Sequence, residues 1–379
     1  MTAARNLALL ADSINSSGVL GESGGGTGTT TGYYGFKNRI INGAMAIDQR
    51  NSGASVTPTN QQYLLDRWVA GLTQASKFSA QQNAGSITPP AGFANYLGVT
   101  SLSAYSVGSG DTFYVQQRIE GYNLADLGWG TGNAKTVTLS FQVYSSLTGT
   151  FGGAIYNNGG TRSYPFTYTV SSANTWTSIS ITIAGDTSGT WVTNNGIGAT
   201  LSFNLGAGST YNGTAGSWAS AFYTSATGAT SIVGTSGATF YITGVQLEKG
   251  STATSFDYRP YGTELSLCQR YCVVQGGATS NDLFATGSGN TSTISSQTFR
   301  PSTTFRAVPS VSYSSLSDLQ IQIVGGSNQT ATSISLVTAI SSPQYLYIDC
   351  GIASGGVAGA VHFLRAANSN ARLTFSAEL

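Results

Sequence analysis

The sequence is poor in charge. Lys, Arg, Asp and Glu make up 8% of its 379 residues, against about 25% in ordinary soluble proteins. Its 16 basic and 15 acidic residues leave a net charge of +1 and form no long run of one sign. Nucleic acids and anionic membranes are bound by clustered Lys and Arg, so we expect neither as a partner. A nearly neutral monomer has little colloidal protection, which favours an oligomer or a larger assembly.

Histidine and cysteine are also scarce, and this limits the chemistry. The sole histidine, His362, lies between apolar residues of a predicted strand, where a structural role is the simpler interpretation. Without a second histidine and a GxSxG motif, a Ser-His-Asp hydrolase has little support. Cys268, Cys272 and Cys350 are too few for a disulfide framework and lack a zinc-finger spacing. We expect reduced thiols, and nothing here predicts a resident cofactor.

Long apolar runs are absent as well. No segment has the ~18 continuous apolar residues of a membrane span, so we expect no membrane insertion. At the start, Leu7, Leu10 and Ile14 recur at spacings of three and four and predict a short amphipathic helix rather than a secretion signal. The Gly- and Ser-rich stretch from Ser16 to Gly32 predicts a flexible tether. Because so short a helix is marginal alone, residues 1–32 are interpreted as an attachment segment.

Glycine, aromatic and β-branched residues are what the sequence has in abundance. It contains 49 Gly, 20 Tyr and 16 Phe. Between residues 33 and 259, stretches such as "TFYVQQRI", "KTVTLSFQV" and "ATLSFNLG" alternate apolar and polar residues and are separated by Gly- and Asn-rich turns. This pattern is typical of an antiparallel β-sandwich.

The stretch "TFYITGVQLEKG" is apolar on both predicted faces. Phe240 and Ile242 lie on one face, Tyr241, Val245 and Leu247 on the other, and Gly244 is expected at a bulge or a close contact. We therefore expect both faces of this strand to be covered, one by a second sheet and the other by a further element that the sequence does not identify.

After Arg259 the period changes. Thr263 is a plausible N-cap, and Leu265, Cys268 and Cys272 then repeat at three and four, which predicts a helical connector at 260–274. Alternation returns in residues 275–379, where Leu373 and Phe375 share one face. The fold class is therefore all-β: a sandwich, a short helical connector and a second, smaller β-sandwich domain, preceded by the N-terminal helix and tether.

Three motifs carry a resemblance to a known family. "NRIINGAMAIDQRNSG" (38–53), "DRW" (66–68) and "GVQLEKGSTATSFDYRPYGTELSLCQRYC" (244–272) resemble a widespread group of bacteriophage tail-fibre and minor virion proteins, and the ending "ARLTFSAEL" is similar too. The resemblance implies a jelly-roll-like first domain similar to carbohydrate-binding modules, and a homotrimer. It also implies contact with other virion proteins through residues 1–32. Where relatives commonly have two aromatics after "CQR", this chain has Tyr271 and Cys272.

Sugar binding requires aromatic faces beside amide and hydroxyl groups. Two stretches, "GYNLADLGWGTGN" and "YNGTAGSWASAFYTS", provide both. The candidate glycan-binding residues are Tyr122, Trp129, Tyr211, Trp218 and Tyr223. Trp129 is expected to be the most exposed of them, since its glycine neighbours cannot shield it. The alternative for each is a role in core or turn packing.

Subunit contacts and a metal site are two further hypotheses. In a trimer, three copies of the 264–272 helix near the axis would give Leu265, Cys268 and Cys272 a mutual apolar seam between subunits. The alternative is a helix that packs on its own sandwich. Asp257, Arg259, Glu264 and Arg270 are expected to pair across the turn or between subunits. The resemblance to jelly-roll carbohydrate modules also implies weak calcium candidates, which are Asn42, Asp48 and Glu248.

These features together predict a non-enzymatic structural fibre of a phage virion, made in the host cytoplasm, that attaches to a host-surface glycan. One alternative is a polysaccharide depolymerase, because phage spikes can cut polysaccharide with paired carboxylates. Against it, the sequence has no solenoid repeat of fixed period. A second alternative is a fibre that decorates the capsid.

Overall fold

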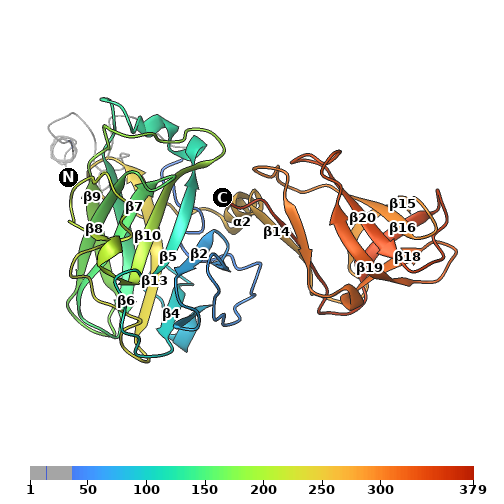
Figure 1. The fold of residues 1–379 in the computed structure, drawn as a ribbon, viewed down its shortest axis with the longest axis horizontal. Coiled ribbons are helices and arrows are strands. Elements are labelled where there is room, and N and C mark those ends of the chain that lie inside the picture. Colours follow the sequence, from blue (N-terminus) through green and yellow to red (C-terminus); the bar gives the residue numbers. More distant parts are fainter. Residues whose placement is uncertain (1–13, 15–35) are drawn as a thin grey trace, which may run out of the picture.

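In the described part of the chain, the strands form two groups, one on each side of the short α-helix α2 (Figure 1). The structure is a computed structural model and describes Ile14 and residues 36–379. The attachment helix and tether expected in residues 1–32 lie outside this described part, Ile14 excepted. Within it, no helix is long and apolar enough to cross a membrane.

The first group of strands forms two sheets that pack face to face. Sheet A has the order β1-β2-β5-β10-β7-β8 and sheet B the order β3-β4-β13-β6-β9. The strands of sheet A are β1 Tyr63–Leu65, β2 Trp68–Leu72, β5 Thr112–Glu120, β10 Ile197–Ala207, β7 Gly149–Asn157 and β8 Ser163–Val170. Those of sheet B are β3 Phe78–Gln82, β4 Leu97–Ser101, β13 Thr239–Lys249, β6 Val137–Ser145 and β9 Thr177–Ile183.

The core lies between the two sheets, as period-two alternation predicts. Phe113 and Phe203 come from sheet A, Phe141 and Phe240 from sheet B, and all four are buried in one apolar cluster. The rings of Phe141 and Phe203 meet across the sheets at 5.0 Å between centroids. The sandwich is thus confirmed.

A bulge in β13 corrects the expected sides of that strand. Gly244 has a φ of +62°, and the register with β6 shifts between Thr243 and Gln246. The bulge turns Val245 and Leu247 back to the core face, so they join Phe240 and Ile242 in the same cluster. The other face is covered by the same chain, since Tyr96 and Tyr144 stack on Tyr241 at 5.2 and 5.4 Å.

The helix α2, Tyr261–Gln269, lies within the expected connector at 260–274, but it begins before Thr263 and ends before Cys272. Thr263 is not its N-cap: the backbone N–H groups of Thr263 and Glu264 donate to the carbonyl of Pro260 at 2.9 and 3.0 Å, so the helix begins directly after the proline. Cys272 lies beyond the helix and begins β14. Cys268 and Cys272 therefore do not share a helical face.

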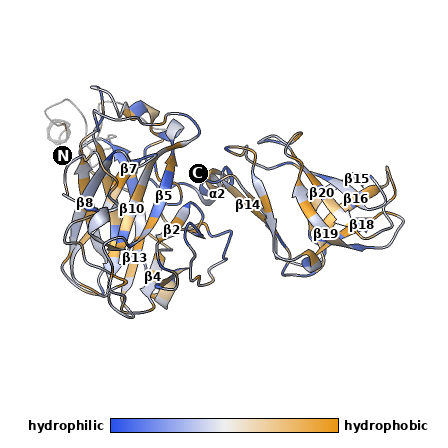
Figure 2. Ribbon diagram, viewed as in Figure 1, coloured by the Kyte–Doolittle hydropathy of each residue, from blue (hydrophilic) through white to orange (hydrophobic). Residues whose placement is uncertain are grey.

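The second group of strands forms a closed barrel with a three-stranded sheet beside it, and Figure 2 shows apolar residues gathered on the strands of both groups. Leu373 and Phe375 point together into the second core, as predicted. The barrel strands in order are β15 Leu283–Gly289, β16 Ile294–Phe299, β20 Leu346–Ile352, β19 Gln329–Leu336, β18 Leu319–Ile323 and β21 Val361–Ala366. The three-stranded sheet contains β14 Cys272–Gly276, β22 Arg372–Ser376 and β17 Ser310–Tyr313.

Short elements complete the described chain. A pair of two-residue strands, β11 Asn212–Gly213 and β12 Ser225–Ala226, runs in parallel over sheet A. The 3-10 turns are η2 Ala84–Ser86, η3 Gly121–Asn123, η4 Ala125–Leu127, η5 Ser209–Tyr211 and η6 Leu316–Asp318.

Candidate functional site

The outer face of sheet A, turned away from sheet B, carries large polar side chains. On β5, Phe113 and Val115 point into the core, so Tyr114, Gln116 and Arg118 alternate to the outer face. Part of this face is covered by the segment around β11 and β12: the Ser202 hydroxyl donates to the Thr224 carbonyl at 3.2 Å. The rest stays open.

The open part is a groove of about 270 Å³. Its lining combines aromatic rings, amides and one guanidinium: Gln61, Tyr114, Gln116, Arg118, Tyr156, Asn157, Asn158, Gly159, Gly160, Ile197, Thr200 and Phe222. The groove is at the small end of ligand sites, which favours one small unit of a ligand rather than a long chain.

Aromatic contacts fix the wall of the groove. The Tyr156 ring meets Phe222 edge to face at 5.1 Å between centroids, and the Tyr156 hydroxyl donates to Gln116 Oε1 at 2.6 Å. Phe222 is 37% exposed. Burial raises the pKa of Tyr114 and of Tyr156, so both phenols stay protonated at neutral pH. A ring with an apolar face and peripheral hydroxyls can stack here and bond to the amides.

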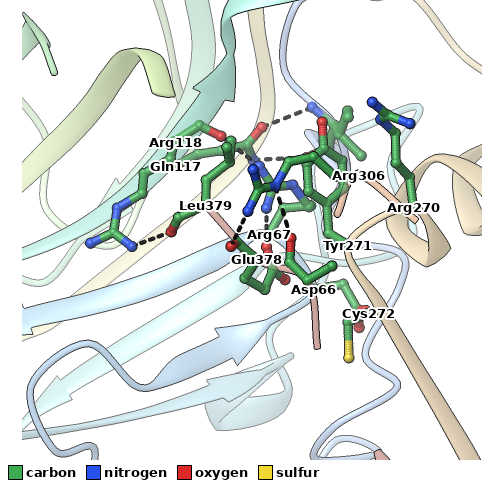
Figure 3. Close-up of polar contacts among 12 residues, drawn as sticks. Asp66, Arg67, Gln117, Arg118, Arg270, Tyr271, Cys272, Arg306, Glu378 and Leu379 are labelled. Atoms are coloured by element: carbon green, nitrogen blue, oxygen red, sulfur yellow. Dashed lines mark hydrogen bonds and ion pairs between the residues drawn. The ribbon is translucent and has the colours of Figure 1, made fainter. Parts of the chain in front are cut away.

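At one end of sheet A the outer face meets the second group of strands (Figure 3). The guanidinium of Arg67 lies 3.6 Å from the centroid of the Tyr271 ring and pairs with the Glu378 carboxylate. Arg50 also pairs with Glu378, at 3.1 Å. Arg118 donates to the backbone oxygen of Leu379. We call this set of contacts the junction.

Two more arginines strengthen the junction. Arg270 pairs with both oxygens of Glu120 at 2.9 and 2.6 Å, and the Tyr271 hydroxyl donates to the same carboxylate at 2.5 Å. These contacts lower the pKa of Glu120 against the effect of its burial. Arg306 donates to the carbonyl of Asn195 in the first group at 2.8 Å and to the carbonyls of Ala377 and Glu378, both at 2.9 Å. The junction therefore joins the two groups through charge-assisted hydrogen bonds.

Asp66 lies in the junction and forms no salt bridge with any residue that the structure describes. Its carboxylate accepts hydrogen bonds from the Gln49 backbone at 2.7 Å and from the Gln49 side chain at 2.6 Å. Burial raises the pKa of Asp66 to about 6. In "DRW", Asp66 and Arg67 are thus a buried acid and a buried base at adjacent positions. Among the described residues, only Arg67 of the two has a salt-bridge partner.

The structure separates the five glycan candidates. Trp129 is 7% exposed, so the expectation of exposure is wrong: the rings of Trp191 and Trp218 meet it at 4.7 and 5.5 Å. Trp218 lies in that cluster, and its indole N–H donates to the Ala184 carbonyl. Tyr211 lies beside the groove, 5.9 Å from Phe222.

None of the five candidates is among the lining residues of the groove. Tyr122 is exposed in η3, and Tyr223 is half-buried against Gly213. The sequence reasoning missed Tyr114, Gln116 and Tyr156. The signal was in β5: large polar residues at the positions that alternate with its core residues.

The contacts expected at α2 lie within one chain. Cys268 is fully buried with Ile41, Ile47 and Tyr271, Leu265 packs against that cluster, and Cys272 is buried too. The helix therefore packs on its own sandwich, which was the alternative. The hypothesis that Cys268 and Cys272 lie in a seam between subunits is wrong, because both are buried within one chain. All three cysteines are free, and burial raises the pKa values of Cys272 and Cys350 to about 12.

The calcium candidates have separate hydrogen-bond partners. The Asn42 side chain bonds to Ile47 and Asp66, Asp48 accepts from the backbone of Asn51 and Gly53, and Glu248 accepts from Gln246 and Thr254. Among the described residues, no group of three or more His, Cys, Asp or Glu side chains is placed to hold a metal ion.

A second hollow, of about 200 Å³, lies beside α2 and is lined in part by Phe93, Phe256 and Tyr258. Its charged residues pair with one another: Arg259 lies 3.5 Å from Asp257 and 3.3 Å from Glu264. The pairing across the turn is as expected, and Arg270 reaches the first domain instead.

No protein-family model and no curated protein matches the sequence. Among solved structures, a sugar-binding protein of Bacteroides thetaiotaomicron, described as putative, has 13% identity and a TM-score of 0.33, with 56% of this chain and all of that one covered. A family 11 carbohydrate-binding module of Clostridium thermocellum has 12% identity and a TM-score of 0.28, with 52% and 98% covered.

The enzymatically active domain of bacteriophage CBA120 tailspike protein 4 is also similar, with 11% identity and a TM-score of 0.31. The match covers 56% of this chain and only 21% of that chain. Similarities this low carry no inference about ligand or activity. The structure by itself shows an all-β chain whose first unit is a two-sheet sandwich with an open groove on sheet A.

Proposed function

We propose that the protein is a structural fibre or appendage protein of a bacteriophage virion that adheres to a host-surface glycan through the groove. The groove on sheet A carries the proposal: aromatic rings and amides line one open hollow, the combination that saccharide recognition requires. The phage assignment is supported by the three sequence motifs. The homotrimer and the attachment through residues 1–32 are supported by the same resemblance.

Adhesion without cutting is favoured over a depolymerase. Cleavage of a glycosidic bond usually requires two carboxylates on either side of the bond. The described lining of the groove includes no Asp or Glu. On sheet A, the nearby carboxylate of Glu120 is engaged by Arg270 and Tyr271.

A glycan array tests the proposal. Phe222→Ala should weaken binding by about two- to tenfold, since an aromatic contact contributes roughly 0.5–1.5 kcal/mol. The matched control is Tyr313→Ala in β17, because Tyr313 and Phe222 are both 37% exposed. Equal loss in both variants, or no binding by the unmodified protein, would contradict the groove as the site.

Two measurements test the remaining parts. Incubation with a bound polysaccharide should leave its chain length unchanged, and release of defined oligosaccharides would establish the depolymerase instead. Light scattering should give the mass of a trimer. A mass near one 39.0 kDa chain at micromolar concentration would contradict the assembly.

A further inference from the structure

We propose that His362 makes the barrel the acid-sensitive part of the protein. The barrel is stable while the imidazole is neutral, and it opens more readily once the imidazole gains a proton. The inference concerns the second group of strands, so it is independent of the groove and of its proposed ligand. It starts from the place of the only histidine in the sequence.

His362 is enclosed in the barrel. Its side chain on β21 is fully buried and points inward, as do Leu364 and Ala366. The residues paired with it on the two neighbouring strands are Gly287 of β15 and Ile323 of β18. An ionisable ring thus lies in an interior whose other side chains are mainly apolar.

A glycine on β15 lets the ring reach the next strand. β15 pairs with β21 on one side and with β16 on the other, and Gly289 is the Cα partner of Ser295. A Cβ atom on Gly289 would lie 2.9 Å from Cε1 of the His362 ring, so a side chain there would displace the ring. Across this glycine, His362 Nδ1 lies 2.9 Å from the Ser295 hydroxyl of β16.

Ser295 links the imidazole to a second buried polar group. Its hydroxyl accepts a hydrogen bond from Gln297 Nε2 at 2.6 Å and keeps its own hydrogen, which it can donate to the bare Nδ1 of a neutral imidazole. His362 Nε2 and Gln297 Oε1 are buried and have no hydrogen-bond partner among the described residues. The network is therefore only partly satisfied even when the imidazole is neutral.

Protonation would weaken this network in two ways. The Ser295 hydroxyl would have to accept from Nδ1–H, and its own hydrogen would lose its acceptor. The new charge would also lack a counter-charge, because the buried polar or charged side chains in the described second group are Ser295, Gln297 and His362. Both effects favour an open barrel, in which water solvates the imidazolium.

The other titratable groups around His362 do not compensate. Cys350 faces inward from β20, and burial raises its pKa to about 12, so it stays neutral. Asp349 of β20 and Arg365 of β21 alternate to the outer face. The strands β15, β16, β18 and β19 and the loop 353–360 contain no charged residue. Burial therefore lowers the pKa of His362 from its ordinary 6.5.

The stability of the barrel should consequently fall in acid. Because the folded barrel holds the proton less tightly than the unfolded chain does, this part of the stability is fully present above pH ~6.5 and is lost as pH falls through the lowered pKa. Asp66 in the first group has a raised pKa and changes stability in the opposite direction. Acid thus acts differently on the two groups of strands.

Hydrogen exchange of the full chain at pH 7 and pH 5, corrected for the intrinsic effect of pH, tests the proposal. Amides of β15, β16 and β21 should lose about three- to twentyfold of their protection at pH 5, since one proton changes an opening constant by at most about tenfold per pH unit. Amides of β5 and β10 in the sandwich should lose none. A loss of equal size in both groups, or none in the barrel, would overturn the proposal.

Two variants assign the effect to the histidine. His362→Gln keeps a polar side chain that takes up no proton, and it should abolish the loss of protection at pH 5. The matched control is Asp349→Asn, which removes a titratable group from the outer face of the same barrel and should retain the loss. A loss that persists in His362→Gln would overturn the role of His362.

A second measurement does not require a variant to fold. In the unmodified chain with nitrogen-15-labelled histidine, His362 gives the only imidazole signals in the NMR spectrum. These signals should titrate with a midpoint below 6.5 and, at neutral pH, show the hydrogen on Nε2. A midpoint at 6.5 or above would contradict an imidazole enclosed without a counter-charge.

Discussion

Arg67 and Arg118 contact two adjacent residues, Glu378 and Leu379 respectively, but differ in their burial (Figure 3). Arg67 is 1% exposed and pairs with the Glu378 carboxylate, whereas Arg118 is half-buried and bonds to an amide and a backbone oxygen. A buried charge requires a partner, so Arg67 is committed to structure. Arg118 lies among the lining residues of the groove, where solvent reaches it. The difference separates a fully buried contact of the junction from one that solvent screens.

Glu378→Gln should have the largest effect on stability. It leaves the Arg67 guanidinium buried without a counter-charge, which costs about 3–5 kcal/mol of the free energy of unfolding. Urea denaturation measures this. The control is Asp257→Asn, whose partner Arg259 keeps a second pair with Glu264; it should cost about 1 kcal/mol or less. Similar losses of stability in both variants would show that the pairs of Glu378 in the junction contribute no more to stability than the pair of Asp257.

Trp129→Ala should cost nearly as much, about 3–5 kcal/mol, because it opens a cavity between Trp191 and Trp218. Phe222→Ala removes an equally hydrophobic side chain from the groove wall and should cost about 1 kcal/mol or less. Thermal melting of both variants measures the difference. A small loss of stability in Trp129→Ala would contradict the burial of Trp129 and make it a candidate for glycan binding at the surface again.

Asp66→Asn should change how stability depends on pH. The pKa of Asp66 is about 6 in the folded protein, against 3.8 ordinarily, so between these values the folded state binds the additional proton. This contribution is fully present below pH ~4, is lost as pH rises to ~6, and amounts to about 2–3 kcal/mol. The variant should lack this part of the slope. Denaturation at several pH values from 4 to 7 measures it; parallel curves would contradict the raised pKa.

Arg118→Gln should have the smallest effect on stability. Its guanidinium is half-buried, so solvent screens its contacts with Gln61 and Leu379, and its loss should cost about 1 kcal/mol or less. The same urea denaturation compares it with Glu378→Gln. A loss as large as that of Glu378→Gln would show that both arginines contribute equally to the junction.

Local patterns predicted the strands well and the site poorly. Alternation in "TFYVQQRI" marks Phe113 and Val115 as core residues, and Gly244 marks a bulge, because strand geometry decides both. The prediction that Val245 faces away from the core was wrong, because the residue inserted at the bulge reverses which of the following side chains point to the core.

The groove could not be located from the sequence, because β5, β7, β10 and the segment around Phe222 meet only in the folded sheet. Trp129 was misjudged for the same reason: its glycine neighbours do not shield it, but two tryptophans distant in the sequence do. Thr263 failed as a cap because the Pro260 carbonyl already accepts the first helical bonds.

The pairing of Arg67 with Glu378 also affects the order in which the protein can fold during synthesis. The two residues are 311 positions apart in the chain. At a synthesis rate of roughly 5–20 residues per second, Arg67 leaves the ribosome about 15–60 s before its counter-ion is made. During that interval the nascent sandwich either leaves this edge open or buries an unpaired charge. The first domain therefore cannot complete this buried ion pair until Glu378 has been synthesised.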